Sequence, residues 1–269
     1  MPNEGIADEE TMTQFATYPS LKGRSVLVTG GATGIGEALV TGFAEQGARV
    51  AFFDIQEDAG RQLSARLAAA GCPEPLYLHC DITDLDQVRD SVSQAIESLG
   101  GLDVLINNAG QANVYKLDKS TDAYEKAAEE IQANYLSVVR LTEKLLPLLS
   151  VQKEAAIVNV TSIVAFAPGV TLPTYSASKA ALRSYSQILR YTLAGTNVKV
   201  FELLPPLVNT ELSVEIGGEN GIPPLEVAEG LLAGFENDEY ELHIGQTANL
   251  YKLFLSSPEQ ALLALNQGR

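Results

Sequence analysis

The stretch Val28-Thr29-Gly30-Gly31-Ala32-Thr33-Gly34-Ile35-Gly36 decides the fold, because it joins an apolar, strand-like run to a helical run through four glycines. Glycine lets a chain turn tightly and brings backbone N–H groups close to a bound phosphate, and the first turn of a helix supplies unpaired N–H groups. The spacing Gly30-xxx-Gly34-x-Gly36 departs from the standard G-x-G-x-x-G fingerprint. The stretch therefore predicts a phosphate cradle between a strand and a helix, or else a tight turn without a ligand.

Short apolar or β-branched runs alternate with longer runs of helical period along the rest of the chain. Strands are expected at residues 25–29, 49–54, 76–79, 104–107, 156–160, 199–203 and 240–244. Helices are expected at residues 34–46, 57–70, 85–99, 122–149, 175–193 and 224–235, followed by a helical turn near 250–255 and a final helix from Pro258. This order predicts a single-domain α/β Rossmann fold, a doubly wound seven-stranded parallel sheet with helices on both faces.

No linker or repeat divides the 269 residues, so one domain is expected from residue 21 to residue 269. It would consist of a cofactor half at about residues 21–113 and a catalytic and substrate half at about residues 114–269. Residues 1–20 carry several acids but no basic or apolar signal segment, and we expect a flexible tail there.

Composition narrows the classes of partner. With 34 acidic and 18 basic side chains the formal net charge is -16, which would repel nucleic acids and anionic lipid surfaces. No apolar run approaches the roughly 18 residues of a membrane helix. Cys72 and Cys80 imply no disulfide framework, and His79 and His243 lack companion ligands for a metal. A cytoplasmic protein without a metal is expected.

Asp54 closes the second expected strand, eighteen residues after Gly36. A carboxylate there can accept hydrogen bonds from both ribose hydroxyls of an adenosine, whereas a 2′-phosphate would meet like charge. Thr33, Ile55 and Gln56 offer no cation against that repulsion, so NAD is expected in preference to NADP. The alternative is that Asp54 simply caps the following helix.

Two further strand ends carry polar or small residues. Asp81 and Ile82, just past the third strand, can hold the adenine edge, although an aspartate there can also cap the next helix. Asn107-Asn108-Ala109-Gly110 ends the fourth strand, where small residues let a cofactor approach and amides can tie strands together. An ordinary Asn-Gly-like turn is the alternative.

Tyr175 and Lys179 lie four residues apart at the start of an expected helix, which places a phenol and an ammonium on one face. A free tyrosine has a pKa of about 10, so it needs a nearby positive charge to act as an acid or base near neutral pH. The spacing is common on helices, and its meaning depends on the rest of the chain.

With these motifs in order, the chain resembles the short-chain dehydrogenase/reductase family over essentially residues 21–245. The family's TGxxxGIG loop is matched by Thr29, Gly30, Gly34, Ile35 and Gly36, and its NNAG motif by Asn107, Asn108, Ala109 and Gly110. Its catalytic tetrad is matched in order by Asn134, Ser162, Tyr175 and Lys179. The resemblance implies an NAD(P)-dependent oxidoreductase that transfers hydride between a nicotinamide and an alcohol or carbonyl substrate.

The resemblance also implies a role for each site residue. Ser162 would hold the substrate oxygen, although a serine can also cap the end of a strand, and Tyr175 would exchange its proton. Lys179 would bind the nicotinamide ribose and lower the tyrosine's pKa, and Asn134 would bend its helix and position a water of the proton relay. Further cofactor contacts are expected from Thr33, Pro205, Val208 and Thr210, besides the glycine loop and the strand ends.

The chain departs from the family at two places. Pro206 stands where the family usually has a glycine, and it stiffens the rim of the site because it lacks an N–H. The family's common C-terminal ending, which often helps to build a tetramer, is replaced by helical sequence. We expect a homodimer or homotetramer, with a dimer through residues 122–149 and 175–193 favoured.

Within the family the two halves resemble different branches. The first half resembles bacterial NAD-dependent xylose-type sugar dehydrogenases, and the second half resembles an oxidoreductase branch named after the D-alanine–lipoteichoate operon. A chimera, natural or engineered, is our hypothesis.

The expected substrate contacts are Ser162, Val164, Pro168, Tyr175 and a lid at residues 207–223. This mostly apolar rim favours a small or moderately apolar alcohol or ketone. The rival functions are a catalytically silent dinucleotide-binding sensor or scaffold, and a lyase or epimerase on the same fold.

Overall fold

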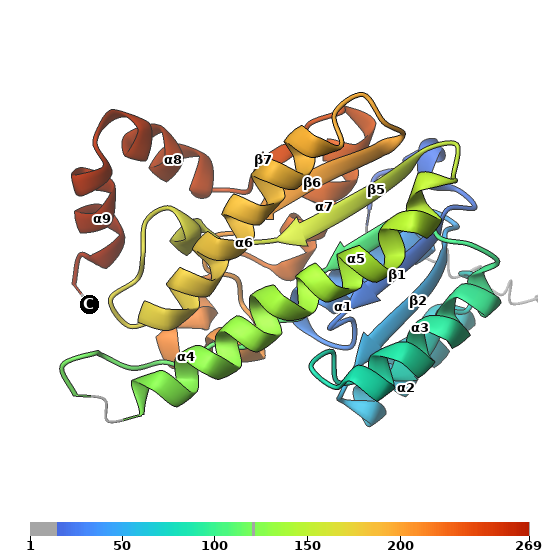
Figure 1. Cartoon of the computed structure of the whole chain (residues 1–269), viewed down its shortest axis with the longest axis horizontal. Helices are drawn as coiled ribbons and strands as arrows, with labels where there is room; N and C mark the ends of the chain where they lie inside the picture. The colour runs from blue at the N-terminus through green and yellow to red at the C-terminus, as the bar shows by residue number, and fades with distance from the viewer. Residues whose placement is uncertain (1–14, 120–121, 269) are drawn as a thin grey trace, which may run out of the picture.

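The structure is a computed structural model in which residues 15–119 and 122–268 are described. The strands within these residues are β1 (Ser25–Thr29), β2 (Arg49–Asp54), β3 (Leu76–His79), β4 (Val104–Asn107), β5 (Ala155–Val160), β6 (Val198–Leu204) and β7 (Glu241–His243). They form one seven-stranded sheet in the order β3-β2-β1-β4-β5-β6-β7, in which every neighbouring pair is parallel (Figure 1). The prediction of a doubly wound parallel sheet is therefore confirmed.

Helices cover both faces of the sheet because side chains alternate along each strand. Val26 and Val28 pack with α1 (Gly34–Glu45), α2 (Glu57–Ala69) and α7 (Pro224–Glu236) on one face. Leu27 points the other way and packs with α3 (Leu85–Leu99), α5 (Ser137–Ser150) and α6 (Pro173–Thr192), which lie in front of the sheet in Figure 1. The chain reverses its direction of winding between β1 and β4, and in this fold class the ligand crevice opens at that switch point.

The segment predicted as one helix over residues 122–149 is interrupted. It consists of α4 (Ala123–Ile131), a five-residue π-helix η2 (Gln132–Leu136) and then α5. Asn134 lies in the π turn with its side chain fully buried, and its carboxamide bonds to Gln111 and Ser178 rather than to its own helix. These outside bonds supply a physical reason for the wider turn, because π turns form where a helix yields to another structural demand.

The N-terminal segment packs on the domain from Phe15 onward. Residues 1–14 of the predicted tail lie outside the described residues. Phe15 is buried in the core, the backbone N–H of Tyr18 donates to Gln46, and its hydroxyl donates to Glu229 at 2.5 Å. A short 3-10 helix η1 (Pro19–Leu21) follows. Residues 15–20, which were predicted as part of the tail, therefore pack on the domain.

The segments around the C-terminal end of the sheet are short helices. A 3-10 turn η3 (Ile163–Ala165) follows β5, and η4 (Glu211–Ile216) and η5 (Gly218–Asn220) follow β6. The chain ends in α8 (Thr247–Ser256) and α9 (Pro258–Asn266), which lie at the opposite end of the molecule from α2 and α3 (Figure 1). In the described part of the chain, no helix has the length and apolar character needed to cross a membrane.

Candidate active site

A cleft of about 660 Å³ runs along the carboxyl ends of the strands, within the usual range for ligand sites. Nearly every predicted site residue lines it: Gly30, Thr33, Gly34, Ile35, Gly36, Asp54, Asp81, Ile82, Asn108, Ala109, Gly110, Ser162, Tyr175, Lys179, Pro205, Val208 and Thr210. Asn134 does not, because it is fully buried behind the wall of the cleft. Of the predicted substrate contacts, Val164 lines the cleft and Pro168 does not.

The glycine loop packs too closely for any side chain. A Cβ atom on Gly36 would lie 1.7 Å from the backbone oxygen of Gly30, and one on Gly30 would lie 2.8 Å from Cα of Ala109. Gly30 and Gly34 also have φ angles of +63° and +58°, which L side chains rarely adopt. The side chain of Asn108 donates to the oxygen of Gly30 at 2.8 Å and so ties the loop to the end of β4. Bare backbone is thereby held at the N-terminus of α1.

Asp54 joins the glycine loop to the start of α2. One carboxylate oxygen accepts from the backbone N–H of Ala32 and the other from that of Gln56, both at 2.9 Å. The N-cap position of α2 is occupied by Gln56, so the alternative of Asp54 as the capping residue does not hold. Ile55, next to it, lines the cleft with 62% of its surface exposed.

Asp81 is likewise not a helix cap. Its side chain accepts from the backbone N–H and the hydroxyl of Thr83, whereas Asp84 caps α3. Asp81 and the buried Ile82 instead form the wall of the cleft beside the end of β3. The Asn107 side chain donates to Asn159 at 2.8 Å and ties β4 to β5, which is the strand-joining role considered for these amides.

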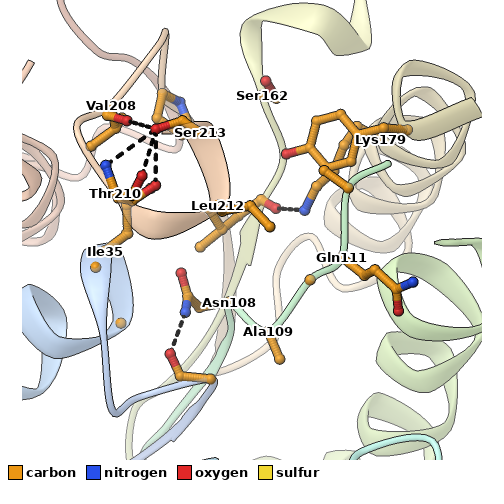
Figure 2. A pocket seen from close by; sticks show the side chains of 18 of the residues that line it. Ile35, Asn108, Ala109, Gln111, Ser162, Lys179, Val208, Thr210, Leu212 and Ser213 are labelled. Carbon is orange, nitrogen blue, oxygen red and sulfur yellow. Dashed lines mark hydrogen bonds between the residues drawn. The ribbon is translucent and has the colours of Figure 1, made fainter. Parts of the chain in front are cut away.

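Ser162, Tyr175 and Lys179 meet at the inner end of the cleft. Ser162 follows β5, its hydroxyl oxygen accepts from the N–H of Val164, and it lies near enough to the phenol of Tyr175 to influence its pKa. The Lys179 ammonium donates to the backbone oxygen of Val160 at 2.8 Å and lies 5.6 Å from the centre of the Tyr175 ring. Figure 2 shows Ser162 and Lys179 on one side of the cleft, Ile35 and Thr210 on the other, and Leu212 between them.

Burial dominates the electrostatics of this group. Burial raises the pKa of Tyr175 above its ordinary value, the nearby Ser162 hydroxyl opposes that rise, and the charge of Glu130 adds to it. Burial also lowers the pKa of Lys179 to about 8, because an ammonium is poorly solvated there. Within the protein alone, without a cofactor, burial outweighs the opposing effect and the surroundings favour a neutral phenol.

Asn134 connects the wall of the cleft with α6, the catalytic helix, which carries Tyr175 and Lys179. Its carboxamide accepts from the N–H of Gln111, donates to the oxygen of Gln111, both at 2.8 Å, and donates to Ser178 at 2.9 Å. One turn earlier, the buried carboxylate of Glu130 accepts from the N–H of Asn113 at 2.7 Å. The two side chains hold the strand-like segment that lines the cleft after Gly110.

Several lining residues were not predicted from the sequence: Gln111, Ala112, Leu172, Gln246 and Leu265. Glu130 was also missed, although its position four residues before Asn134 places both on one helix face. The apolar lining residues could not be found in this way, because a leucine that lines a cleft cannot be told from a leucine that packs in the core by its residue type alone.

The cleft fits a nicotinamide dinucleotide. A phosphate cradle without side chains lies at the N-terminus of α1, a carboxylate closes β2, and an ammonium lies at the far end beside a serine and a tyrosine. Among the described lining residues, Lys179 is the one Lys or Arg.

The comparisons with known proteins agree with this geometry. A family model described as "short chain dehydrogenase" matches residues 24–220. D-xylose 1-dehydrogenase of Caulobacter vibrioides is 35% identical over 196 residues, which cover 73% of this chain and 76% of that protein. The uncharacterized oxidoreductase DltE of Bacillus subtilis is 38% identical over 200 residues, which cover 74% of this chain and 77% of that protein.

Two solved structures share the fold. A short-chain dehydrogenase from Burkholderia cenocepacia in complex with NADP has a TM-score of 0.78 and 28% identity, covering 93% of this chain and 99% of that chain. A short chain dehydrogenase/reductase from Burkholderia phymatum in complex with NAD has a TM-score of 0.81 at 21% identity, covering 89% of this chain and 96% of that chain. The second likeness supports the fold alone.

The alignments with the xylose dehydrogenase and with DltE are both longer than either predicted half, residues 21–113 or 114–269. Each relative therefore aligns across the boundary between the halves, and the chimera stays a hypothesis. The family is not in question: the chain belongs to the short-chain dehydrogenase family and is an oxidoreductase of that family.

Proposed function

We propose that this protein oxidises an alcohol or reduces the matching carbonyl with NAD, using Tyr175 as the acid–base group. The observation that carries the proposal is the meeting of Ser162, Tyr175 and Lys179 at one end of a cleft whose other end is the side-chain-free glycine loop. A nicotinamide dinucleotide bound in this cleft would supply or accept the hydride.

The side chains divide the remaining work. The Ser162 hydroxyl, which lines the cleft together with the Tyr175 phenol, is placed to hold the substrate oxygen beside that phenol. In the oxidation direction Tyr175 takes the hydroxyl proton of the substrate, and in reduction it returns a proton to the carbonyl oxygen. Lys179, anchored on the oxygen of Val160, supplies the positive charge that favours the phenolate form. The bond of Asn134 to Ser178 keeps the catalytic helix against the cleft wall.

The preference for NAD rests on charge. Asp54 brings a carboxylate to the end of β2, and Thr33, Ile55 and Gln56 around it carry no charge. An extra phosphate on the adenosine ribose would face this carboxylate without a cation to offset the repulsion. The relative solved with NADP is 28% identical and does not decide the matter for this chain.

The substrate proposed is a small or moderately apolar alcohol or ketone. The substrate end of the cleft is lined by Ile163, Val164, Leu172, Leu207, Ile216 and Leu265. A sugar such as the one in the name of the Caulobacter relative would find few hydrogen-bond partners among these apolar side chains, and a buried polar group needs a hydrogen bond. Glu211, on the rim, disfavours carboxylate and phosphorylated substrates by like charge. The free thiols of Cys72 and Cys80 suit a reducing compartment such as the cytoplasm.

The proposal is tested by incubating the protein with NAD or NADP and a panel of alkanols, cycloalkanols and sugars while following the absorbance of the reduced cofactor. We expect turnover with apolar alcohols and a kcat/KM at least about tenfold higher with NAD than with NADP, about 1.4 kcal/mol. Binding of NADH without turnover on any substrate, in either direction, would identify a silent sensor or scaffold instead. Better turnover with NADP would refute the role given to Asp54.

A further inference from the structure

The substrate end of the cleft is closed by an element beyond the family match, which ends at residue 220. The last helix, α9, contributes Leu265 to the lining, and Gln246, just before α8, contributes a second residue. Leu265 and Tyr175 pack against the same buried cluster, which contains Ile163, Val164, Phe166, Ala167, Leu204 and Ala261. One wall of the cleft near Tyr175 is therefore built partly from α9.

A side-chain clasp holds α9 to the loop that precedes the catalytic helix. The Asn266 carboxamide oxygen accepts from the N–H of Val170 at 2.6 Å, and its nitrogen donates to the oxygen of Pro168 at 2.9 Å. The same nitrogen donates to the oxygen of Leu262 within α9 at 2.8 Å. One carboxamide thus bridges two backbone groups of the loop, and that loop leads into Leu172, which lines the cleft.

Aromatic and charged contacts hold α8 in the same way. Tyr251 on α8 lies 5.1 Å from Phe166 in an edge-to-face arrangement. Its hydroxyl also accepts from Arg183 of α6 at 3.2 Å, and Arg183 pairs with the buried Glu202 of β6 at 3.0 Å. The hairpin of α8 and α9 is thereby attached to the catalytic helix and to the sheet, so Leu265 has a fixed place relative to Tyr175.

We propose that α9 is the specificity wall of this enzyme: Leu265 sets the length of the carbon chain accepted, and the Asn266 clasp holds it there. The inference rests on the proposed function and goes beyond it by naming the substrate class as unbranched secondary alcohols and methyl ketones with a medium-length alkyl tail. The tail extends from the oxygen held at Ser162 and Tyr175, passes Val164 and Leu172, and ends against Leu265. An uncharged tail matches the apolar side chains of Val164, Leu172 and Leu265 along this path.

The test compares wild type with Leu265→Ala and Leu265→Phe on 2-alkanols of increasing length, with NAD as the cofactor. Leu265→Ala should move the optimum of kcat/KM to longer alcohols, by about fourfold for each newly admitted methylene, since each is worth about 0.8 kcal/mol. Leu265→Phe should move the optimum to shorter alcohols. Leu263→Ala is the matched control, because Leu263 lies on the same helix with 57% of its surface exposed and does not line the cleft.

The role of the Asn266 clasp is tested with the variant Asn266→Ala. The control is Gln267→Ala, because Gln267 is the next residue and is exposed. Asn266→Ala should raise KM for long alcohols several-fold and leave kcat for short ones nearly unchanged. Calorimetric binding of the matching 2-alkanones to the complexes of each variant with NADH gives a second readout that needs no turnover. If the variants show no turnover but the best-bound length of 2-alkanone changes with the residue at position 265, the role proposed for Leu265 is supported and the proposed oxidoreductase function is refuted. If the preferred alcohol length and the affinities for 2-alkanones are the same in wild type and in both Leu265 variants, the proposed role of α9 is wrong, whether or not the protein has activity.

Discussion

At the scale of single residues, burial shifts the pKa values of both Tyr175 and Lys179. The tyrosine holds its proton more firmly and the lysine less firmly than in water. Their grouping with Ser162 and Asn134 could be predicted from the sequence because the four residues match the family's catalytic motif in order, whereas the spacing of Tyr175 and Lys179 alone is common on helices. The balance of their charges could not, because it depends on how deeply the folded chain covers them and on Glu130.

The raised pKa of Tyr175 predicts its titration. A phenol whose pKa is raised loses its proton only at a pH above the ordinary value of 10.0, so Tyr175 should stay protonated up to that pH in the protein without cofactor. The chain has ten tyrosines, and the phenolate absorbance of wild type minus that of Tyr175→Phe isolates this one. Saturating NAD brings a further positive charge into the cleft and should lower the pKa. A Tyr175 phenolate near pH 8 without cofactor would contradict the burial argument.

At the scale of elements, the strands were the most predictable part. β1 to β4 begin and end where the sequence pattern places them, and β5 to β7 differ by no more than one residue at either end. Strands buried on both faces are short apolar runs bounded by turns, so their limits are visible in sequence. The resemblance implied a bend in the helix at Asn134, but the form of that bend, a π turn, was not visible in the sequence, because the bonds that explain it come from Gln111 and Ser178, which are distant in sequence.

The glycine loop gives an element-scale prediction. Gly36→Ala places a methyl group 1.7 Å from the oxygen of Gly30, so the loop must move, at a stability cost of about 1–3 kcal/mol. We expect NADH affinity to fall by at least about tenfold and the thermal midpoint to drop, as measured by NADH fluorescence and calorimetry. Gly71→Ala is the control, since no atom lies within 4 Å of the added Cβ, and Gly71, unlike Gly36, has a positive φ of +83° that strains any side chain. A loss of NADH affinity in Gly36→Ala no larger than that in Gly71→Ala would contradict the argument from crowding in the loop.

At the scale of the whole molecule, fold class and cleft position followed from the order of elements, whereas the C-terminal wall did not. Helical sequence after β7 was expected, but its packing on η3 and the clasp of Asn266 depend on a loop about a hundred residues earlier. Contacts so distant leave no periodic signal in the sequence. The substrate end was accordingly the least predictable part of the site.

Assembly is the second whole-molecule question, and we propose a homodimer through α5 and α6. Large apolar side chains on these helices are exposed in the single chain: Leu136 precedes α5 at 43%, and Ile188 and Tyr191 on α6 are at 59% and 81%. Pairing two copies would cover them. Light scattering after size exclusion should give twice the chain mass of 28.7 kDa, and Ile188→Glu should give the monomer. A wild-type monomer at micromolar concentration would contradict the proposal, and a tetramer would require a second interface.

The most direct test of the account is a comparison of wild type with Tyr175→Phe, measuring NADH binding and alcohol turnover on the same preparations. The substitution removes one hydroxyl oxygen and leaves the glycine loop, Asp54 and Lys179 in place. We predict NADH affinity within about threefold of wild type and a kcat lowered at least about a thousandfold, because general acid–base groups contribute roughly 10²–10⁴-fold and this one also holds the substrate oxygen. Turnover in Tyr175→Phe close to that of wild type would contradict the account.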